Sequence, residues 1–597
     1  MIGFVALLDT RGGSDVRALV TRAAARLPCT GPGTLTVLDD GPAALAAAPW
    51  FTEPLGGAWR ADGNDRLLLA GTVRLDARAE LRTALTAAGH ELGDAAGDEL
   101  LLATAYRAWG SSMAEHLIGD YAFVVWDPAR RTMLCARDPF GVRPLYFIAD
   151  AARLACSSSI EPLRALPDVG DALNMRAVAD FLREGYTTDP RGTIWRDVHR
   201  VAPGHTVIVS LLESVPLVRR HWDFPVPSPL RYRDPADYAA HYREVLGEAV
   251  RDRLRCGSAT IQLSGGIDSP TLAVTARRVA PQLALHAYTF VNERAVPTDD
   301  ERRFAILAAR AAGATQEIED LSDQMPFEHL DDPAFRSSEP LDGAETATWR
   351  RFAVHAATRS PVQLIGEDGD ALFLPSGLRT MLRTQGLADV LADVASYARA
   401  RGRLPHTGLY LRRRLRSAFS RPPGSNAPWI RPGLLTSEAA VPAAPAITPH
   451  PIRPESHARL ANPLWQSLLE SIDPSAVPAA LDVRLPLIDP RVIAFVWAIP
   501  PIPWCQRKEL ARVAFRDDLP AALLTRRKTP LYHFEEYQVA RWRARALPVT
   551  LRSAAIREFV DFRTVETIFQ NGSVHSMRAA WRVLALDRWL ADSIASV

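Results

Sequence analysis

Strands and helices alternate along residues 258–366, and no other feature restricts the fold of this chain as strongly. ATIQL, LALHAYTF and VQLIG have the character of buried strands, whereas intervening stretches such as SPTLAVTARRVA and DERRFAILAARAAG have helical spacing. This order predicts βαβ units and a parallel sheet that helices cover on both faces. Because ligands of such sheets bind at the carboxyl ends of the strands, we expect a site in the loops that follow ATIQL and VQLIG.

The first 225 residues have a different texture, made of short apolar runs separated by turn residues. LTVLDD, RLLLAG, YAFVVWD, TMLCAR and PLYFIA predict strands, and ELLLATAYRAWG and MRAVADFLREGY have helical spacing. Residues 204–225 predict a last hairpin, which leads into the Pro-rich linker PVPSPLRYRDP. We therefore predict an α/β protein with two domains, an α+β sandwich over residues 1–225 and a parallel-sheet domain over residues 226–597.

The second domain becomes mainly helical beyond Gly377. Residues 420–456 interrupt this pattern with a stretch that is dense in Pro, Ala and Ser. Such a composition buries little apolar surface, so we expect an irregular or mobile segment there.

Composition excludes several classes of protein. Of the 597 residues, 47% are hydrophobic and 23% are charged, which is the balance of a globular enzyme with a sizeable core. The net charge of +2 gives no field that would attract nucleic acid or a membrane surface. No run of about 18 apolar residues occurs, and the five cysteines have no spacing that holds zinc. We expect a cytoplasmic protein without nucleic-acid or membrane partners.

The loop LSGGIDS after the first strand of the alternating region is typical of an anion-binding turn. Its glycines let the backbone approach an anion, and the helix that follows offers unpaired N–H groups and the positive end of its dipole. A Walker-type loop is excluded, because Ile267, Asp268 and Ser269 stand where a lysine would be needed. An acid beside phosphates needs a cation between them, which favours Asp268 as a Mg²⁺ ligand. The alternative is a plain strand-to-helix turn with Asp268 as its cap.

A second acidic turn follows VQLIG. The stretch LIGEDGDALF places Gly366, Glu367, Asp368 and Asp370 at the carboxyl end of another strand. Two strand ends that each present an acid could hold a divalent ion that bridges pyrophosphate oxygens and neutralises a leaving pyrophosphate. The alternative is an Asp-rich turn on the surface.

These motifs together resemble the asparagine synthetase family. SGGIDS resembles its pyrophosphatase loop, and LIGEDGDALF resembles its second signature. LDVRLPLIDPRVIAFVWAIPP and KELARVAFRDDLPAALLTRRKTP are similar to later stretches of that family. GDYAFVVWDPARRTMLCARDPFGVRPLYF resembles the glutaminase-type amidotransferase domain that precedes the synthetase. The resemblance covers nearly the whole chain, in order.

The family reaction implies the use of ATP and Mg²⁺: ATP adenylates a carboxylate, pyrophosphate leaves, and a nitrogen nucleophile attacks the acyl-adenylate to form an amide. The resemblance implies that the nucleotide is held by Leu263, Ser264, Gly265, Gly266, Asp268, Ser269, Phe290 and Gly366, with Phe290 and Gly366 lining the adenine pocket. It implies that Asp268 and Asp370 bind Mg²⁺. It also implies that Lys508 is a catalytic lysine that stabilises charge on the phosphate and on the tetrahedral intermediate. The alternative for Lys508 is a lysine on the surface of the helix QRKELARV.

Glu367 stands where asparagine synthetases carry a glutamate near the attacking nitrogen and where β-lactam synthetases carry a tyrosine. A carboxylate there could accept a proton from an amine, provided that burial raises its pKa toward neutrality. Asp368 stands where glycine is usual, and the sequence assigns it no role.

The glutaminase signature is incomplete. Glutamine-dependent members need a cysteine at position two, where this chain has Ile2. The family's Asn-Gly-Glu glutamine clamp has no counterpart, because Val73 and Arg74 stand where small and acidic groups are needed. We predict an inactive first domain and a nitrogen that arrives on the substrate itself.

Three branches of the family remain. They are ammonia-dependent asparagine synthesis, β-lactam or carbapenam synthesis on a small amino acid derivative, and lasso peptide cyclisation. Glu367 in place of a tyrosine, the extra length, and the stretch LANPLWQSLLESIDPS favour the lasso cyclase. The basic run LRRRLRSAF at 411–419 could meet carboxylates of a peptide, or be a solvated helix face.

The preferred hypothesis is therefore a cyclase that joins an Asp or Glu side chain of a core peptide to the N-terminal amine as a macrolactam. The resemblance implies three partners: a precursor peptide, a leader peptidase and a leader-recognition protein. A hypothesis from a different class is an inactive scaffold that binds peptide and partner proteins.

Overall fold

The computed structural model describes most of the chain. The described residues are 3–28, 34–49, 56–61, 66–295, 300–328, 332, 336–342, 344, 346–367, 369–405, 427–436, 448–477, 479–526, 532–545 and 550–594. Ile2, Asp368 and the basic run 411–419, all singled out in the sequence, lie outside them.

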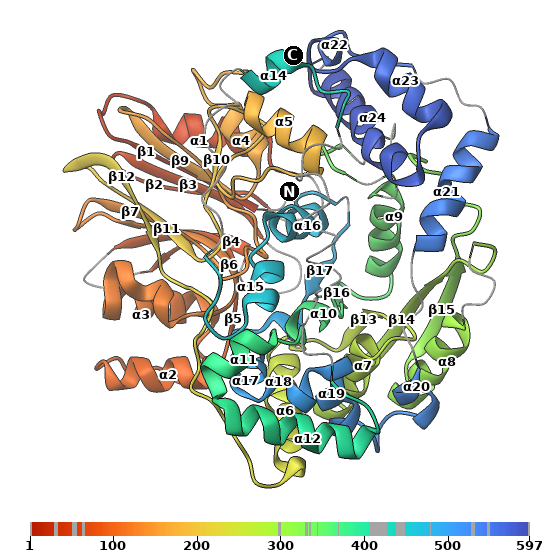
Figure 1. The fold of residues 1–597 in the computed structure, drawn as a ribbon. Helices are drawn as coiled ribbons and strands as arrows, with labels where there is room; N and C mark the ends of the chain where they lie inside the picture. The colour runs from red at the N-terminus through yellow and green to blue at the C-terminus, as the bar shows by residue number, and fades with distance from the viewer. Residues whose placement is uncertain are drawn as a thin grey trace.

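Two six-stranded antiparallel sheets form the N-terminal part, drawn in red to yellow in Figure 1. The first sheet has, in spatial order, β10 (His199–Arg200), β8 (Tyr146–Ala149), β9 (Arg153–Ser157), β1 (Gly3–Asp9), β3 (Ala43–Ala48) and β2 (Thr36–Asp40). The second has β12 (Glu213–Arg220), β11 (His205–Ser210), β7 (Thr132–Arg137), β6 (Ile118–Asp127), β5 (Leu67–Asp76) and β4 (Gly56–Ala61). The helices of this part are α1 (Val16–Ala24), α2 (Arg78–Ala87), α3 (Asp98–Trp109), η1 (Gly110–His116), α4 (Ile160–Arg164) and α5 (Met175–Glu184).

The strands are apolar on both faces because both faces are covered. In β6 the side chains of Val124 and Trp126 join the core between the two sheets, whereas Phe123 and Val125 join the core under α3. Successive residues of a strand point to opposite faces, so one apolar run serves two cores. The predicted sandwich is confirmed, and the two predicted helical stretches are α3 and α5 of its outer layers.

A five-stranded sheet forms the centre of the second part. Its spatial order is β15 (Thr315–Asp320), β14 (Ala284–Val291), β13 (Ser258–Gln262), β16 (Val362–Leu364) and β17 (Asp482–Arg484). Every neighbouring pair is parallel. The predicted parallel sheet is confirmed, and with it the α/β class. Two strands escaped prediction, because β15 is polar and half exposed and β17 has only three residues.

Helices surround this sheet and continue to the C-terminal side of the chain. They are α6 (Pro235–Asp252), α7 (Asp268–Val279), α8 (Glu301–Ala312), α9 (Thr346–Ala357), α10 (Gly369–Leu372), α11 (Leu378–Gln385), α12 (Leu387–Arg401), α14 (Pro432–Thr436), α15 (Pro454–Leu460), α16 (Pro463–Ile472), η4 (Pro486–Ile488), α17 (Pro490–Ala498), α18 (Pro501–Trp504), η5 (Gln506–Lys508), α19 (Glu509–Ala514), α20 (Ala521–Thr525), α21 (Tyr532–Ala544), α22 (Ile556–Phe559), α23 (Phe562–Asn571) and α24 (Val574–Ile594). Among the described residues, no helix has the length and apolar character needed to cross a membrane.

The last helices of the chain pack against α5 and share the buried cluster that covers the first sheet. Met577 and Leu586 of α24 share one buried cluster with Val5 and Leu7 of β1 and with α5, and α24 lies beside α5 in Figure 1. Within the Pro-rich stretch predicted to be irregular, the described residues 427–436 include the fully buried Trp429. The C-terminal helices are thus an outer layer of the N-terminal sandwich.

Candidate active site

The two loops predicted to form a site meet at the carboxyl edge of the parallel sheet. The strand β13 leads into Ser264 and then into α7, which begins at Asp268, while the neighbouring strand β16 leads into Gly366. A Cβ atom on Gly366 would lie 2.9 Å from the backbone nitrogen of Ser269, so only glycine permits this approach. The structure therefore brings the two predicted turns into direct contact.

The SGGIDS loop is held in shape by its own serines. The backbone N–H of Ser264 donates to Ser269 Oγ at 2.9 Å, and the two serine hydroxyls lie 3.0 Å apart. The N–H of Gly266 donates to Ser264 Oγ at 3.2 Å. The loop is consequently ordered before any ligand arrives, which lowers the entropy cost of binding one.

A carboxylate already occupies one amide of this loop. The N–H of Gly265 donates to Glu301 Oε1 at 2.6 Å, and Glu301 Oε2 pairs with Arg526 Nη1 at 2.7 Å. The guanidinium of Arg526 in turn lies 4.7 Å from the ring centre of Phe304. A negatively charged oxygen at a loop N–H next to an arginine is the arrangement that a phosphate oxygen would take.

Lys508 points to the two predicted metal ligands. Its Nζ contacts Asp268 Oδ2 and lies 2.6 Å from Asp370 Oδ1. The lysine side chain is only 12% exposed, whereas those of Asp268 and Asp370 are 20% and 57% exposed. Arg507 and Lys508 have φ angles of 54° and 57°, a left-handed conformation that costs a non-glycine residue about 1–3 kcal/mol. Such strain is common where a side chain is held in position for function, and this lysine is not a surface residue.

The residues present fit a Mg²⁺ ion that enters with a nucleotide. Mg²⁺ binds through one or two carboxylates together with substrate phosphates and water, and Asp268 and Asp370 are two carboxylates that converge from different loops. Among the described residues, no cluster of three or more His, Cys, Asp or Glu side chains could hold a metal without such a substrate.

An open cleft lies over these loops. Its walls are Gln262, Ser264, Asp268, Ser269, Gly366, Glu367, Asp370, Ala371, Arg459 and Trp465. The sequence did not identify Arg459 and Trp465, which stand at the end of α15 and in α16. The only signal for Trp465 was its place in LANPLWQSLLESIDPS, and spacing along the chain gives no reason for either residue to meet the loops.

The other predicted site residues lie in different surroundings. Leu263 is buried, and its backbone is committed to Tyr288 and Thr289 of the next strand. Phe290 packs against Phe352 with ring centres 3.8 Å apart and ring planes tilted by 30°. Neither is among the cleft walls, and their contact with adenine stays a prediction. Glu367 is an exposed wall of the cleft, so the burial on which its action as a base depends is not provided by the protein alone.

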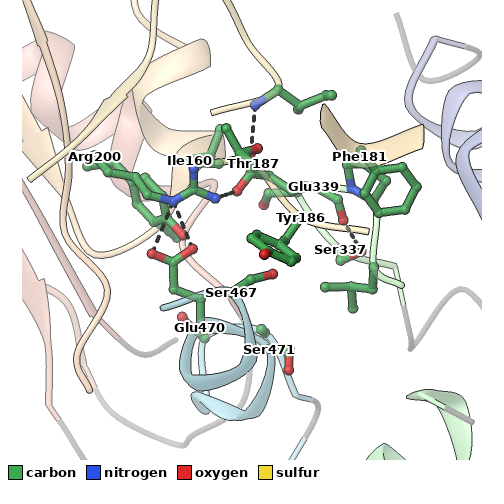
Figure 2. A pocket seen from close by; sticks show the side chains of 18 of the residues that line it. Ile160, Phe181, Tyr186, Thr187, Arg200, Ser337, Glu339, Ser467, Glu470 and Ser471 are labelled. Atoms are coloured by element: carbon green, nitrogen blue, oxygen red, sulfur yellow. Dashed lines mark hydrogen bonds and ion pairs between the residues drawn. The ribbon is translucent and has the colours of Figure 1, made fainter. Parts of the chain in front are cut away.

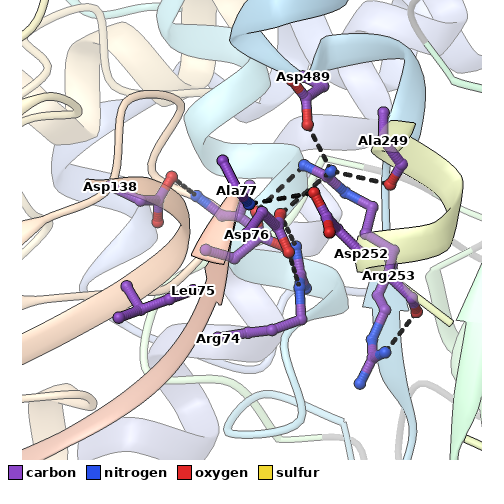
Figure 3. Close-up of polar contacts among 12 residues, drawn as sticks. Arg74, Leu75, Asp76, Ala77, Asp138, Ala249, Asp252, Arg253 and Asp489 are labelled. Carbon is purple, nitrogen blue, oxygen red and sulfur yellow. Dashed lines mark hydrogen bonds and ion pairs between the residues drawn. The ribbon is translucent and has the colours of Figure 1, made fainter. Parts of the chain in front are cut away.

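The stretch that departs from the glutamine clamp forms a buried ion network, shown in Figure 3. Arg74, 1% exposed, lies 3.0 Å from Asp76 and 2.6 Å from Asp120. Asp76 also lies 3.1 Å from Arg253, which pairs with Asp489 at 2.6 Å. Burial would raise the pKa of Asp76, but Arg253 and Arg74 hold it well below its ordinary value. The clamp region thus joins β5 to the end of α6 and the start of α17.

Comparison with known proteins agrees with this arrangement. Residues 241–591 match the asparagine synthase family, and residues 60–222 match the glutamine amidotransferase domain family. Similar proteins include a candidate glutamine-hydrolyzing asparagine synthetase of Mycobacterium tuberculosis, 26% identical over 87% of this chain and 82% of that protein. They also include the glutamine-hydrolyzing asparagine synthetase 3 of Bacillus subtilis, 24% identical over 78% of this chain and 75% of that protein. A solved structure of the allosteric regulatory enzyme of purine biosynthesis aligns with 55% of this chain and 82% of its own at a TM-score of 0.28 and 14% identity.

The family match, together with the acidic loops and lysine at the carboxyl edge of a parallel sheet, defines the class of an ATP-dependent amide-forming ligase. The chain belongs to the asparagine synthase family and carries a glutamine amidotransferase-like domain ahead of the synthetase domain.

Proposed function

We propose that this chain is an ATP- and Mg²⁺-dependent lasso peptide cyclase. It adenylates an Asp or Glu side chain of a core peptide and closes a macrolactam ring with the N-terminal amine of the same peptide. Its partners are the precursor peptide, a peptidase that releases the amine and a protein that recognises the leader, and it works in the cytoplasm.

The reaction has two steps that balance with one ATP. A carboxylate oxygen of the peptide attacks the α-phosphorus, and pyrophosphate leaves. The N-terminal amine then attacks the acyl carbon, loses a proton, and AMP leaves. The peptide loses one water in total. Because both reacting groups belong to one molecule, holding the peptide in a folded form makes the second step intramolecular and supplies much of the rate.

Four parts of the site would do this chemistry. The N–H of Gly265 would hold a phosphate oxygen after Glu301 has yielded its place, in a loop that the serine hydrogen bonds keep in shape. Mg²⁺ held by Asp268 and Asp370 would neutralise the pyrophosphate. Lys508, which faces both acids, would stabilise charge on the α-phosphate and on the tetrahedral intermediate. Glu367 would receive the amine proton once a bound peptide covers it.

The observation that carries the choice among amide-forming ligases is the network around Arg74. A buried arginine with its carboxylate partners stands where the resemblance places the family's glutamine clamp, which supports a first domain that does not supply ammonia from glutamine. A nitrogen that belongs to the substrate is then the simplest source. The extra length and α16 at the cleft favour a peptide over a small amino acid derivative.

Mass spectrometry of a precursor peptide would test the proposal. The peptide would be incubated with the protein, leader-processing partners, ATP and Mg²⁺. We expect loss of one water from the core peptide, in step with AMP release, and neither with Lys508→Ala. A peptide that is cleaved but keeps its water, while AMP forms with small amino acid derivatives, would favour a β-lactam or carbapenam-type synthetase.

Two further outcomes separate the remaining rivals. Asparagine formed from aspartate and ammonia would support the ammonia-dependent synthetase. No ATP consumption with every partner present would support an inactive peptide-binding scaffold.

A further inference from the structure

One wall of the nucleotide cleft has no part in the chemistry described above. It consists of Arg459, in the last turn of α15, and Trp465, in α16. Only Ala461 and Asn462 lie between the two helices. Asn462 holds this corner, because its Oδ1 accepts from the N–H of Leu464 and its carbonyl accepts from the N–H of Trp465, both at 2.9 Å. The corner presents an arginine and an aromatic ring to the same cleft.

Both helices of this wall are anchored away from the cleft. Glu470, near the end of α16, pairs with Arg200 at 3.0 Å, as Figure 2 shows, and with Arg137 at 3.0 Å. In α15, the hydroxyl of Ser456 donates to the carbonyl of Leu374 at 3.3 Å, shortly after the end of α10. These contacts fix the wall before a ligand arrives, which lowers the entropy cost of binding one.

The arginines at the two ends of α15 are used differently. Arg453, at the start, is buried, and its guanidinium donates to the carbonyls of Val496 and Ile499 at 2.9 and 2.7 Å. Arg459, at the end, is exposed, and its guanidinium has neither a hydrogen bond nor an ion pair within the part of the chain that the structure describes. Arg453 therefore serves the fold, whereas Arg459 keeps its donors for a ligand.

The rest of the cleft is acidic. Its walls include Asp268, Glu367 and Asp370, and Lys508 is already in contact with the two aspartates. Among the described walls, Arg459 is the one cation. Mg²⁺ and Lys508 would meet the charges of the ATP phosphates. A substrate carboxylate that approaches the α-phosphorus is then repelled unless a further cation accompanies it.

We propose that Arg459 binds the carboxylate that is adenylated, and that Trp465 packs against the peptide chain beside it. The proposal rests on the proposed function for the identity of the substrate. The guanidinium stays protonated while a carboxylate oxygen bonds to the α-phosphorus, the bond to pyrophosphate breaks and the acyl group loses its negative charge. Arg459 then holds the product less tightly than the substrate, so it acts in binding more than in the chemical step.

Calorimetry with short peptides tests this without turnover. The protein is first saturated with Mg²⁺ and α,β-methylene-ATP, which cannot release pyrophosphate. The probe is acetyl-Gly-Asp-Phe-amide, and acetyl-Gly-Asn-Phe-amide is its neutral match. We expect the acid to bind at least about tenfold more tightly, the gain of a hydrogen bond between charged groups. Equal affinity for the two peptides, or binding of neither, would overturn the proposal.

Variants assign this preference to Arg459. Arg459→Gln should abolish it, and Arg459→Lys should keep part of it because the charge remains. The matched control is Arg310→Gln, because Arg310 is also exposed and in the last turn of a helix, α8, but is not a wall of the cleft. It should bind both peptides like wild type. A preference that survives in Arg459→Gln would refute the assignment.

Trp465 should act on both peptides alike. Trp465→Ala should weaken the acid and the amide by similar factors and leave their ratio unchanged, because contact with an aromatic ring does not depend on the charge of the peptide. A ratio that falls to one in Trp465→Ala while Arg459→Gln keeps it would contradict the roles given to the two residues.

Pyrophosphate–ATP exchange separates a carboxylate site from a phosphate site. With a processed precursor peptide, Arg459→Gln should raise the KM for the peptide at least about tenfold and leave the KM for ATP within about twofold of wild type. A raised KM for ATP with an unchanged KM for the peptide would place Arg459 on the phosphates and refute the proposal.

Failure of this proposal and failure of the proposed function are distinguishable. Acid-selective binding that requires Arg459, without ring closure of the precursor peptide, would keep the carboxylate site and refute the cyclase. Ring closure by Arg459→Gln at the wild-type KM would keep the cyclase and refute the carboxylate site.

Discussion

Two clusters in this molecule contain acids beside basic side chains, but one cluster holds the fold together and the other faces a cleft. Around Arg74 and Arg253, acids and arginines are buried and paired within the protein. Around Lys508, one cation faces two acids in a cleft, and Asp370 is more than half exposed. The first cluster has exchanged water for protein partners and has nothing left to offer a ligand. The second keeps solvent access, so a nucleotide and its metal can take over the interactions. The two clusters contain similar charged residues, and the exposure of those residues decides whether a cluster holds the fold together or can bind a ligand.

The largest effect on stability is expected from a substitution in the buried cluster. Arg253→Met removes one of the two arginines that pair with each of Asp76 and Asp489, whose other partners are Arg74 and Arg491. Breaking a buried pair in this way costs about 3–5 kcal/mol. Urea unfolding of the variant and wild type at pH 7 measures it. A loss under about 1 kcal/mol would show that water enters the network.

The second largest effect is expected from a substitution in the cluster around Lys508, and it concerns activity. Lys508→Met should lower AMP release by about a hundred- to a thousandfold, because a positive charge aimed at developing negative charge is lost. Its stability should match wild type, since Asp268 and Asp370 remain in contact with water. Single-turnover kinetics measure the rate of AMP release, and urea unfolding measures the stability. A variant that unfolds readily yet turns over normally would reverse the comparison.

The third effect is a dependence of stability on pH, and it concerns Asp138, which lies beside the buried cluster. Burial, assisted by the charge of Asp120, raises the pKa of Asp138 from 3.8 to about 6. The folded state then holds a proton that the unfolded state has lost, so this group makes stability fall as pH rises from about 4 to 6. Asp138→Asn lacks this term, and its stability relative to wild type should improve by roughly 2–3 kcal/mol across that range.

Urea midpoints at pH 4.5, 5.5 and 7 measure this trend. Any hydrogen bonds that the Asp138→Asn substitution removes are missing at every pH, so their loss does not alter the slope. A constant difference between variant and wild type would show that Asp138 is charged throughout.

The smallest effect is a control at the surface. Arg294 and Asp323 form an ion pair whose side chains are 60% and 70% exposed. Exposed pairs contribute little to stability, so Arg294→Ala should leave the urea midpoint of unfolding indistinguishable from that of wild type. A loss comparable with that of Arg253→Met would mean that burial does not explain the difference between the clusters.

Much of the fold follows from local pattern. The alternation of strands and helices predicts the parallel sheet, and the ends of its strands predict where Asp268 and Gly366 lie. These signals come from residues close together in the chain. The short β17 and the polar β15 carry no such signal, because they become strands only by pairing with neighbours.

Side-chain surroundings depend on contacts between distant segments and are harder to predict. Arginine is usually exposed, so nothing local indicates that Arg74 is buried beside Asp120. Trp465 reaches the cleft only because α16 packs beside the sheet. The reverse holds for Leu263, which adjoins the loop in sequence but is buried away from the cleft.

The packing of α24 on α5 ties the N-terminal part to the end of the chain. The last long helix completes the hydrophobic core of the first strand, so the two ends of the chain depend on each other for their solvent protection. Deleting residues 1–225 would expose the apolar face of α24 and would damage the synthetase side as well. A domain that completes its neighbour's hydrophobic core cannot be removed without exposing that core, whatever reaction the domain itself performs.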